Sequence, residues 1–123
     1  MERLIDQRIR NRIIEMLEWV IECEHTAPDL GLEELVNAWD DLVDSPFQPD
    51  RFPDPTYTDE ERQSLRAVSA AMDAFCVATP QKIIDQDGAL MLSEWKTLTS
   101  RAKDAYTCLM NRGRLPEDRE TQG

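Results

Sequence analysis

His25, the single histidine of the chain, follows Glu22 by three residues. On a helix this Glu-x-x-His spacing places a carboxylate and an imidazole on one face, where both can bind a transition metal. A two-iron centre of this kind needs the motif twice and two further inward carboxylates, and the sequence holds no second histidine. We therefore predict no metal site and no cofactor, and we interpret His25 as a residue near a helix end.

The three cysteines, Cys23, Cys76 and Cys108, are the other side chains with nucleophilic or metal-binding chemistry. They are widely spaced, form no Cys-x-x-Cys pair and have mainly apolar neighbours. Such thiols are typical of reduced core or half-buried cysteines in an intracellular protein. The sequence shows no signal-peptide pattern and no apolar run long enough to span a bilayer. These features together predict a cytoplasmic protein that does not bind membranes.

Carboxylates are concentrated in one part of the chain. Residues 29–61 carry eleven of them against a single base, Arg51, whereas residues 1–28 and 62–123 have net charges of −2 and +1. A concentrated negative surface attracts cationic partners and repels nucleic acid and anionic lipid. The charge distribution therefore predicts a cationic protein as the partner and argues against direct binding of nucleic acid.

Part of this acidic segment resembles a known magnesium-binding pattern. The carboxylates between Glu33 and Asp44 are similar to the helical carboxylate sets with which all-α nucleoside triphosphate pyrophosphohydrolases hold magnesium. The resemblance implies a metal-dependent nucleotide hydrolase. The sequence departs from the pattern, because Asn37 stands four residues after Glu33 and no paired Glu-x-x-Asp follows in the next predicted helix. The hydrolase is kept as an alternative function.

The spacing of apolar residues predicts the elements that position these side chains. Repeats of three and four residues predict four main helices, over Leu4 to His25, Leu32 to Val43, Thr58 to Ala78, and Leu90 to Asn111. Thr58 and Glu61 have the spacing of a capping box at the start of the third. A short turn is expected from Thr79 through Ile84, followed by a break at residues 85–88. No segment alternates with a period of two, so no sheet is expected.

The connection between the second and third predicted helices is long and contains four prolines. Prolines exclude a regular helix and favour an extended path. The same segment is rich in aromatic residues, which is unusual for a flexible linker. We therefore expect the connection to be held against the helices by Phe47, Phe52 and Tyr57.

These elements predict an all-α fold, a four-helix antiparallel bundle with a long Pro-rich connection between helices two and three. Residues 1–115 are expected to form a single helical domain, and residues 116–123 a flexible C-terminal tail. Ten residues on the inward stripes are expected to be buried together: Leu35, Trp39, Leu42, Val68, Met72, Phe75, Trp95, Leu98, Tyr106 and Leu109.

The first predicted helix carries a charged pair on its apolar side. At about 100° per residue, Asp6 and Arg10 fall on the same arc as Ile13 and Leu17, where apolar residues are expected. Either the first turns extend into solvent, or they meet another subunit or the end of another helix. The order of arginines before glutamates along this helix also opposes its macrodipole, and the acidic segment is one candidate for pairing with the arginines.

The function expected from these features is that of a non-enzymatic, cytoplasmic, bacterial interaction protein in an inhibitor, immunity-type or adaptor role. Its carboxylates would steer a cationic protein, and its aromatic residues would supply desolvated contacts. The alternatives are the all-α metal-dependent nucleotide hydrolase and a structural oligomer, such as a homodimer, with a solubilising acidic surface. No catalytic residue is assigned. The candidate partner-binding residues are Glu33, Glu34, Asp40, Asp41, Asp44, Phe47, Asp50, Phe52 and Asp54.

Overall fold

The computed structural model describes residues 2–44, 47–80 and 83–120. These residues form five α-helices and one short 3-10 helix, and no β-strand lies among them. The elements in chain order are α1 (Glu2–Glu22), α2 (Leu32–Val43), η1 (Pro49–Arg51), α3 (Asp59–Ala78), α4 (Gln86–Leu90) and α5 (Ser93–Met110). The predicted all-α fold class is confirmed for this part of the chain.

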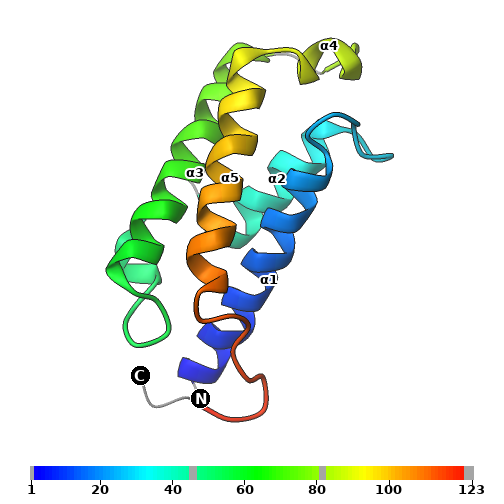
Figure 1. Ribbon diagram of the computed structural model, residues 1–123. Coiled ribbons are helices and arrows are strands. Elements are labelled where there is room, and N and C mark those ends of the chain that lie inside the picture. Colours follow the sequence, from blue (N-terminus) through cyan, green and yellow to red (C-terminus); the bar gives the residue numbers. More distant parts are fainter. Residues whose placement is uncertain (1, 45–46, 81–82, 121–123) are drawn as a thin grey trace.

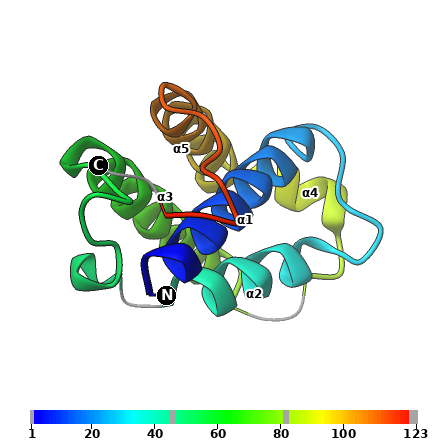
Figure 2. The same cartoon turned by 90° about the horizontal axis from the view of Figure 1, so that it is seen from below.

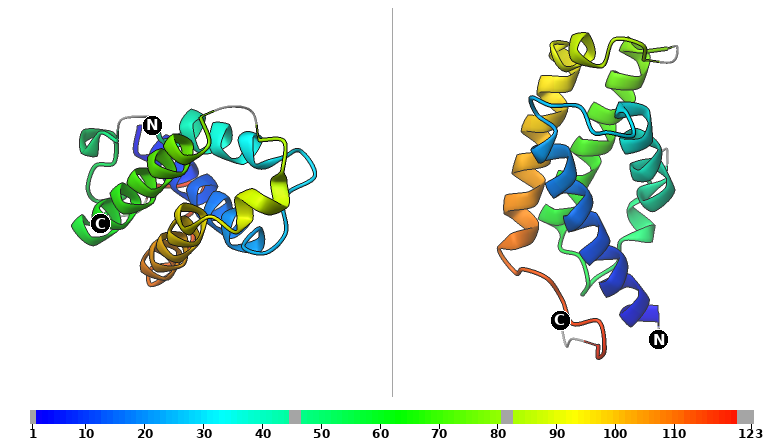
Figure 3. Two further views of the ribbon diagram at one scale, coloured as in Figure 1. Left: turned by 90° about the horizontal axis from the view of Figure 1, so that it is seen from above. Right: turned by 90° about the vertical axis from the view of Figure 1, so that its right-hand side faces the viewer.

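The four longer helices alternate in direction along the molecule (Figure 1). α3 and α5 pack side by side, and α1 packs against both α5 and α2. Seen from the side, α1 crosses the molecule obliquely between these two neighbours (Figure 3). α4 lies at the end of the molecule where α5 begins, and the chain after α5 returns along the first turns of α1 (Figure 2).

The hydrophobic core forms where the apolar stripes of the helices meet. All of the ten residues expected in the core are buried except Leu42 and Tyr106, which are half-buried. Tyr106 keeps one edge at the surface, where its hydroxyl lies 3.5 Å from Glu18 Oε2. Leu42 lies at the margin of the α2 stripe, beside α1. None of the helices in the described ranges combines the length and apolar character needed to cross a membrane.

The Pro-rich connection is held against the helices by stacked aromatic rings. Phe47 and Phe52 lie parallel with ring centroids 5.0 Å apart, and Tyr57 meets Phe52 edge-on at 5.2 Å. Phe52 and Tyr57 are buried. The expectation that aromatic residues hold this segment is confirmed. Pro46, one of its prolines, lies outside the described residues.

Two boundaries near α4 differ from the prediction. The break expected at residues 85–88 is the start of a helix, because Asp85 Oδ1 accepts a hydrogen bond from the Gly88 amide at 2.9 Å and caps α4. Thr79 ends α3 and donates its amide to Phe75 O at 3.0 Å. The expected turn through Ile84 includes residues 81–82, outside the described part. The prediction failed at Asp85 because aspartate and glycine are common in both loops and helix caps.

The contacts of Arg10 explain why a charged residue lies on the apolar side of α1. Its side chain is fully buried, with 0% exposed. Nη2 donates to Glu61 Oε2 and to Leu109 O, both at 2.9 Å, and Nη1 donates to Gly113 O at 2.6 Å. α1 therefore meets the end of another helix, α5, which is one of the arrangements that the sequence left open. The acidic segment supplies the countercharge through Glu61.

Glu61 joins three parts of the chain. It accepts a hydrogen bond from the Thr58 amide at 3.1 Å, while the Thr58 hydroxyl accepts one from the Glu61 amide, which confirms the predicted capping box. Arg112 Nη2 donates to Glu61 Oε1 at 2.6 Å. Burial alone would raise the pKa of Glu61, but hydrogen bonds from Arg112 and Arg10 outweigh it and the pKa is lowered.

The chain beyond α5 lies against α1. Gln7 Nε2 donates to Pro116 O at 2.7 Å and to Arg119 O at 2.9 Å. Asn11 Nδ2 donates to Leu115 O at 2.8 Å, and the Leu115 amide donates back to Asn11 Oδ1 at 3.0 Å. The sequence predicts a flexible tail from residue 116. In the structure, a buried polar side chain of α1 donates hydrogen bonds to backbone carbonyl groups of this segment.

Candidate functional site

Helical geometry divides the carboxylates of α2 into two rows. Glu33, Asp40 and Asp44 lie toward α3, as shown by the pocket that Glu33 shares with α3 and by the repulsion between Asp40 and a carboxylate of α3. Glu34 and Asp41, seven residues apart, lie toward α1, where Asp41 lines a pocket shared with that helix. Two of the three carboxylates toward α3 have partners within the molecule, whereas both carboxylates toward α1 are exposed.

In the row toward α3, two carboxylates are engaged within the molecule. Glu33 Oε1 accepts a hydrogen bond from the Ile83 amide at 2.7 Å, and Asp44 forms an ion pair with Arg51. Asp40 remains exposed. Partial burial raises the pKa of Asp40, and repulsion from Asp73 and the neighbouring aspartates of α2 raises it further. A cation placed near Asp40 would therefore stabilise its ionised carboxylate.

In the row toward α1, Glu34 and Asp41 are exposed and have no ion pair or hydrogen bond within the described ranges. Two carboxylates of α1 have a cationic partner. Glu15 Oε2 lies 2.9 Å from Arg114 Nη1, and Glu18 Oε1 lies 3.0 Å from Arg114 Nη2. Glu34 and Asp41 therefore add uncompensated negative charge to the surface of α2.

The acidic candidates in the connection are divided in the same way. Asp54 Oδ2 lies 3.4 Å from Arg62 Nη2, and Arg62 also pairs with Asp59. Asp50 is exposed and has no ion pair among the residues that the structure describes. Of the two candidates here, only Asp50 adds an uncompensated charge to the surface of the molecule.

The two aromatic candidates do not form an exposed anchor. Phe52 is only 3% exposed and belongs to the core, which corrects its assignment as a partner-binding residue. Phe47 is half-buried, and the guanidinium of Arg66 covers its ring at 5.7 Å from the centroid. Both rings stabilise the connection. The sequence alone could not separate this role from partner binding, because aromatic residues in a proline-rich segment serve both.

The residues with metal-binding spacing are not brought together. His25 is 88% exposed and its Nε2 lies 3.5 Å from Glu24 Oε1. Glu22 is exposed on α1. Across residues 2–44, 47–80 and 83–120, no three histidine, cysteine or carboxylate side chains form a group able to hold a metal ion. The carboxylates of α2 diverge to two sides of the helix instead of converging on a second helix.

A pocket of about 470 Å³ lies between α1 and α2 and is called the α1–α2 pocket below. Its floor and sides are mostly apolar, and Asp41 stands at the rim on α2. Sequence reasoning missed this site, although the position of Trp19 off the main stripe of α1 was a signal of it. The residues lining the pocket are Arg12, Glu15, Met16, Trp19, Ala38, Asp41 and Leu42.

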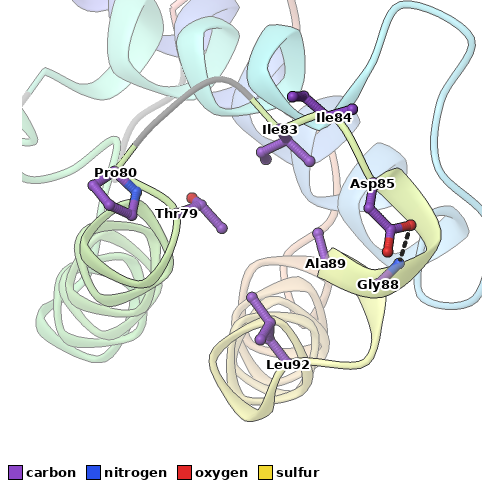
Figure 4. Close-up of a pocket in the computed structure, with 8 residues that line it drawn as sticks. All are labelled: Thr79, Pro80, Ile83, Ile84, Asp85, Gly88, Ala89 and Leu92. Carbon is purple, nitrogen blue, oxygen red and sulfur yellow. Dashed lines mark hydrogen bonds between the residues drawn. The ribbon is translucent and has the colours of Figure 1, made fainter.

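A second pocket of about 490 Å³ lies between the end of α3 and α4 (Figure 4). It is lined mainly by apolar side chains, and Ile84 at its edge is 92% exposed. The carboxylate of Asp85 is turned to the Gly88 amide, which it caps. Among the described residues that line this pocket, Asp85 is the one with a charged side chain, and that carboxylate is engaged in the cap.

Comparison with known proteins found no matching family model, no similar curated protein and no similar solved structure.

Proposed function

We propose that the chain is a non-enzymatic, cytoplasmic interaction protein, a four-helix antiparallel bundle that presents α2 to a cationic protein. The observation that carries this proposal is the absence of cationic partners around Glu34, Asp40 and Asp41 in the described structure, whereas Glu15 and Glu18 of α1 are paired with Arg114. Uncompensated charges of one sign raise the association rate of an oppositely charged partner. We name these three residues the acidic face.

The raised pKa of Asp40 supports the same proposal. Repulsion among Asp40, Asp73 and Asp41 costs free energy in the unbound protein, in addition to the cost of partial burial. A lysine or arginine of a partner placed near Asp40 relieves this repulsion. The acidic face therefore favours a cation of a partner over a second copy of itself.

The hydrolase alternative has less support. Two-metal and magnesium sites need carboxylates that converge from facing helices on one cleft. On α2, Glu33 binds a backbone amide, and Glu34 points about 120° away from Asp40 around the helix axis. We therefore do not propose nucleotide hydrolysis.

The test compares the wild type with a variant that neutralises the acidic face, Glu34→Gln/Asp40→Asn/Asp41→Asn. Proteins captured from a host lysate are identified by mass spectrometry, and the association rate of each purified candidate is measured at two salt concentrations. We expect the variant to associate at least about tenfold more slowly and to lose most of the salt dependence.

A matched control removes the same charge elsewhere, at three exposed carboxylates on other helices, with Glu22→Gln/Glu60→Gln/Asp87→Asn. This control is expected to retain most of the association rate. Equal slowing by both variants would show that only net charge matters. A captured partner indifferent to salt and to the acidic-face variant would overturn the proposal.

A further inference from the structure

The α1–α2 pocket has the size and composition to receive one large apolar side chain. Trp19 and Leu42 are half-buried at its sides, and Met16 is 8% exposed. These side chains bury enough surface to pack the core yet leave apolar atoms open to solvent. A large side chain inserted here would remove that surface from water, which is the usual source of binding energy in a partner anchor.

The charges around the pocket are asymmetric. On α1, Arg12 lies 2.6 Å from Glu117 and 3.5 Å from Glu15, and Glu15 lies 2.9 Å from Arg114. These four side chains neutralise one another. On α2, Asp41 at the rim has no partner in the described ranges. A cation approaching the pocket is therefore attracted to the α2 rim, because the paired charges of the α1 rim cancel.

Two exposed carboxylates lie on the side of α2 that bears the pocket. Ala38 and Asp41 line the pocket, and Glu34 lies four residues before Ala38, outside the lining. A helix rises 1.5 Å per residue, so the two carboxylates stand about 10.5 Å apart along one side of α2. Ala38, midway between them, opens into the pocket. A helix of a partner protein that carries two cations seven residues apart, with an apolar residue midway between them, matches the spacing of Glu34 and Asp41.

We propose that the α1–α2 pocket binds an apolar side chain of an amphipathic helix in the cationic partner. Lysine or arginine residues seven positions apart in that helix pair with Glu34 and Asp41. This inference rests on the proposed function and adds the class of ligand and the anchor site. The small side chain of Ala38 is required, because a larger residue there would fill the pocket.

A second copy of the chain is a poorer occupant than a separate cationic helix. Lys96 and Lys103 on α5 are seven residues apart, but the residues between them on that face are Thr99 and Ser100. Lys103 is also engaged, since its Nζ lies 2.8 Å from Glu24 Oε2. α5 therefore lacks the apolar anchor and one of its two cations.

The test uses synthetic helical peptides with two lysines seven residues apart and leucines midway between them. Trp19 is a built-in reporter, because Trp39 and Trp95 are only 1% and 0% exposed. We expect peptide binding to shift the emission of Trp19 to shorter wavelength and to protect it from acrylamide quenching. Peptides with the lysines changed to glutamine, or the leucines to alanine, are each expected to bind about tenfold more weakly or worse.

Two protein variants separate the pocket from the acidic face. Ala38→Leu is expected to weaken binding of the complete peptide about tenfold while its thermal melt stays close to that of the wild type. Glu34→Gln/Asp41→Asn is expected to weaken binding and to reduce its salt dependence. Ile84→Ala, in the pocket beside α4, is the control and is expected to bind like the wild type.

The outcomes distinguish the two proposals. If Ala38→Leu binds the peptide like the wild type while Glu34→Gln/Asp41→Asn binds it weakly, the proposal of an anchor in the α1–α2 pocket is wrong and that of the acidic face is retained. Wild-type binding by both variants would overturn both proposals. Loss of binding in Ile84→Ala would place the anchor at the other apolar pocket and would also overturn this inference.

Discussion

Glu61 caps a helix, neutralises a buried arginine and fixes the end of α5 at the same time. A buried charge left without its partner costs about 3–5 kcal/mol. We therefore expect Glu61→Gln to lower the free energy of unfolding by that amount, as measured by urea denaturation, because Arg10 is 0% exposed and loses its countercharge. Glu60→Gln, at the exposed neighbouring position, is the control and is expected to change stability by less than about 0.5 kcal/mol.

The lowered pKa of Glu61 also predicts a dependence of stability on pH. Its carboxyl group has an ordinary value of 4.5, and in the folded protein the pKa lies below that value. In the window between the two values the unfolded chain binds the proton and the folded chain does not, so acidification favours unfolding. Thermal melts of the wild type are expected to lose stability as the pH falls below about 4.5 and through the lower folded value. Glu61→Gln is expected to remove part of that slope, and an unchanged slope would contradict this role.

Tyr57 is buried, and its hydroxyl has no hydrogen-bond partner within the described ranges. Burial also raises the pKa of this hydroxyl above its ordinary value. A buried polar group without a partner costs about 1–3 kcal/mol. Tyr57→Phe keeps the ring against Phe52 and is therefore expected to leave the free energy of unfolding unchanged or to raise it by about 1 kcal/mol. A loss above about 1 kcal/mol in urea denaturation would show that the hydroxyl is satisfied.

At the scale of elements, the difference in burial predicts that truncating a core side chain of α3 costs more unfolding free energy than truncating one at the edge of α2. Phe75 is 0% exposed and its ring lies 5.2 Å from that of Trp95, so Phe75→Ala is expected to cost about 3–5 kcal/mol. Leu42 is half-buried beside the α1–α2 pocket, and Leu42→Ala is expected to cost less than about 2 kcal/mol. Urea denaturation of both variants checks the order, and equal losses would contradict the edge position of Leu42.

The regular parts of the fold could be predicted because their physics is local. Apolar spacing predicted α2 with the bounds that the structure has, and the Thr58 capping box predicted the start of α3. Long-range pairing could not be predicted in this way. The partner of Arg10 is Glu61, fifty-one residues later, and no local signal connects them. The α1–α2 pocket was missed for the same reason, since Trp19 and Leu42 meet only when two helices cross.

At the scale of the whole molecule, the chain after α5 joins the two ends of the sequence. Asn11 is 2% exposed and exchanges two hydrogen bonds with Leu115. Deleting residues 115–123 is expected to lower the free energy of unfolding by about 1–3 kcal/mol, because Asn11 loses these hydrogen bonds. The control Glu117→Gln removes one ion pair with Arg12 and is expected to cost less than about 1 kcal/mol.

Hydrogen exchange gives an independent measure of the same segment. The Leu115 amide donates to Asn11 Oδ1 at 3.0 Å and is expected to exchange more slowly than an unstructured amide. Exchange at the random-coil rate, together with no loss of stability on deletion, would support the flexible tail that the sequence predicts.

The hydrogen bonds of Arg10 also constrain when the protein can fold during its synthesis. Two of its acceptors, Leu109 O and Gly113 O, come ninety-nine and one hundred and three residues after it in the chain. While these residues are still inside the ribosome, the guanidinium of Arg10 has no place in a closed core and must stay in water. We therefore expect the apolar stripe of α1 to stay incompletely covered until translation has passed α5, since α1 packs against that helix.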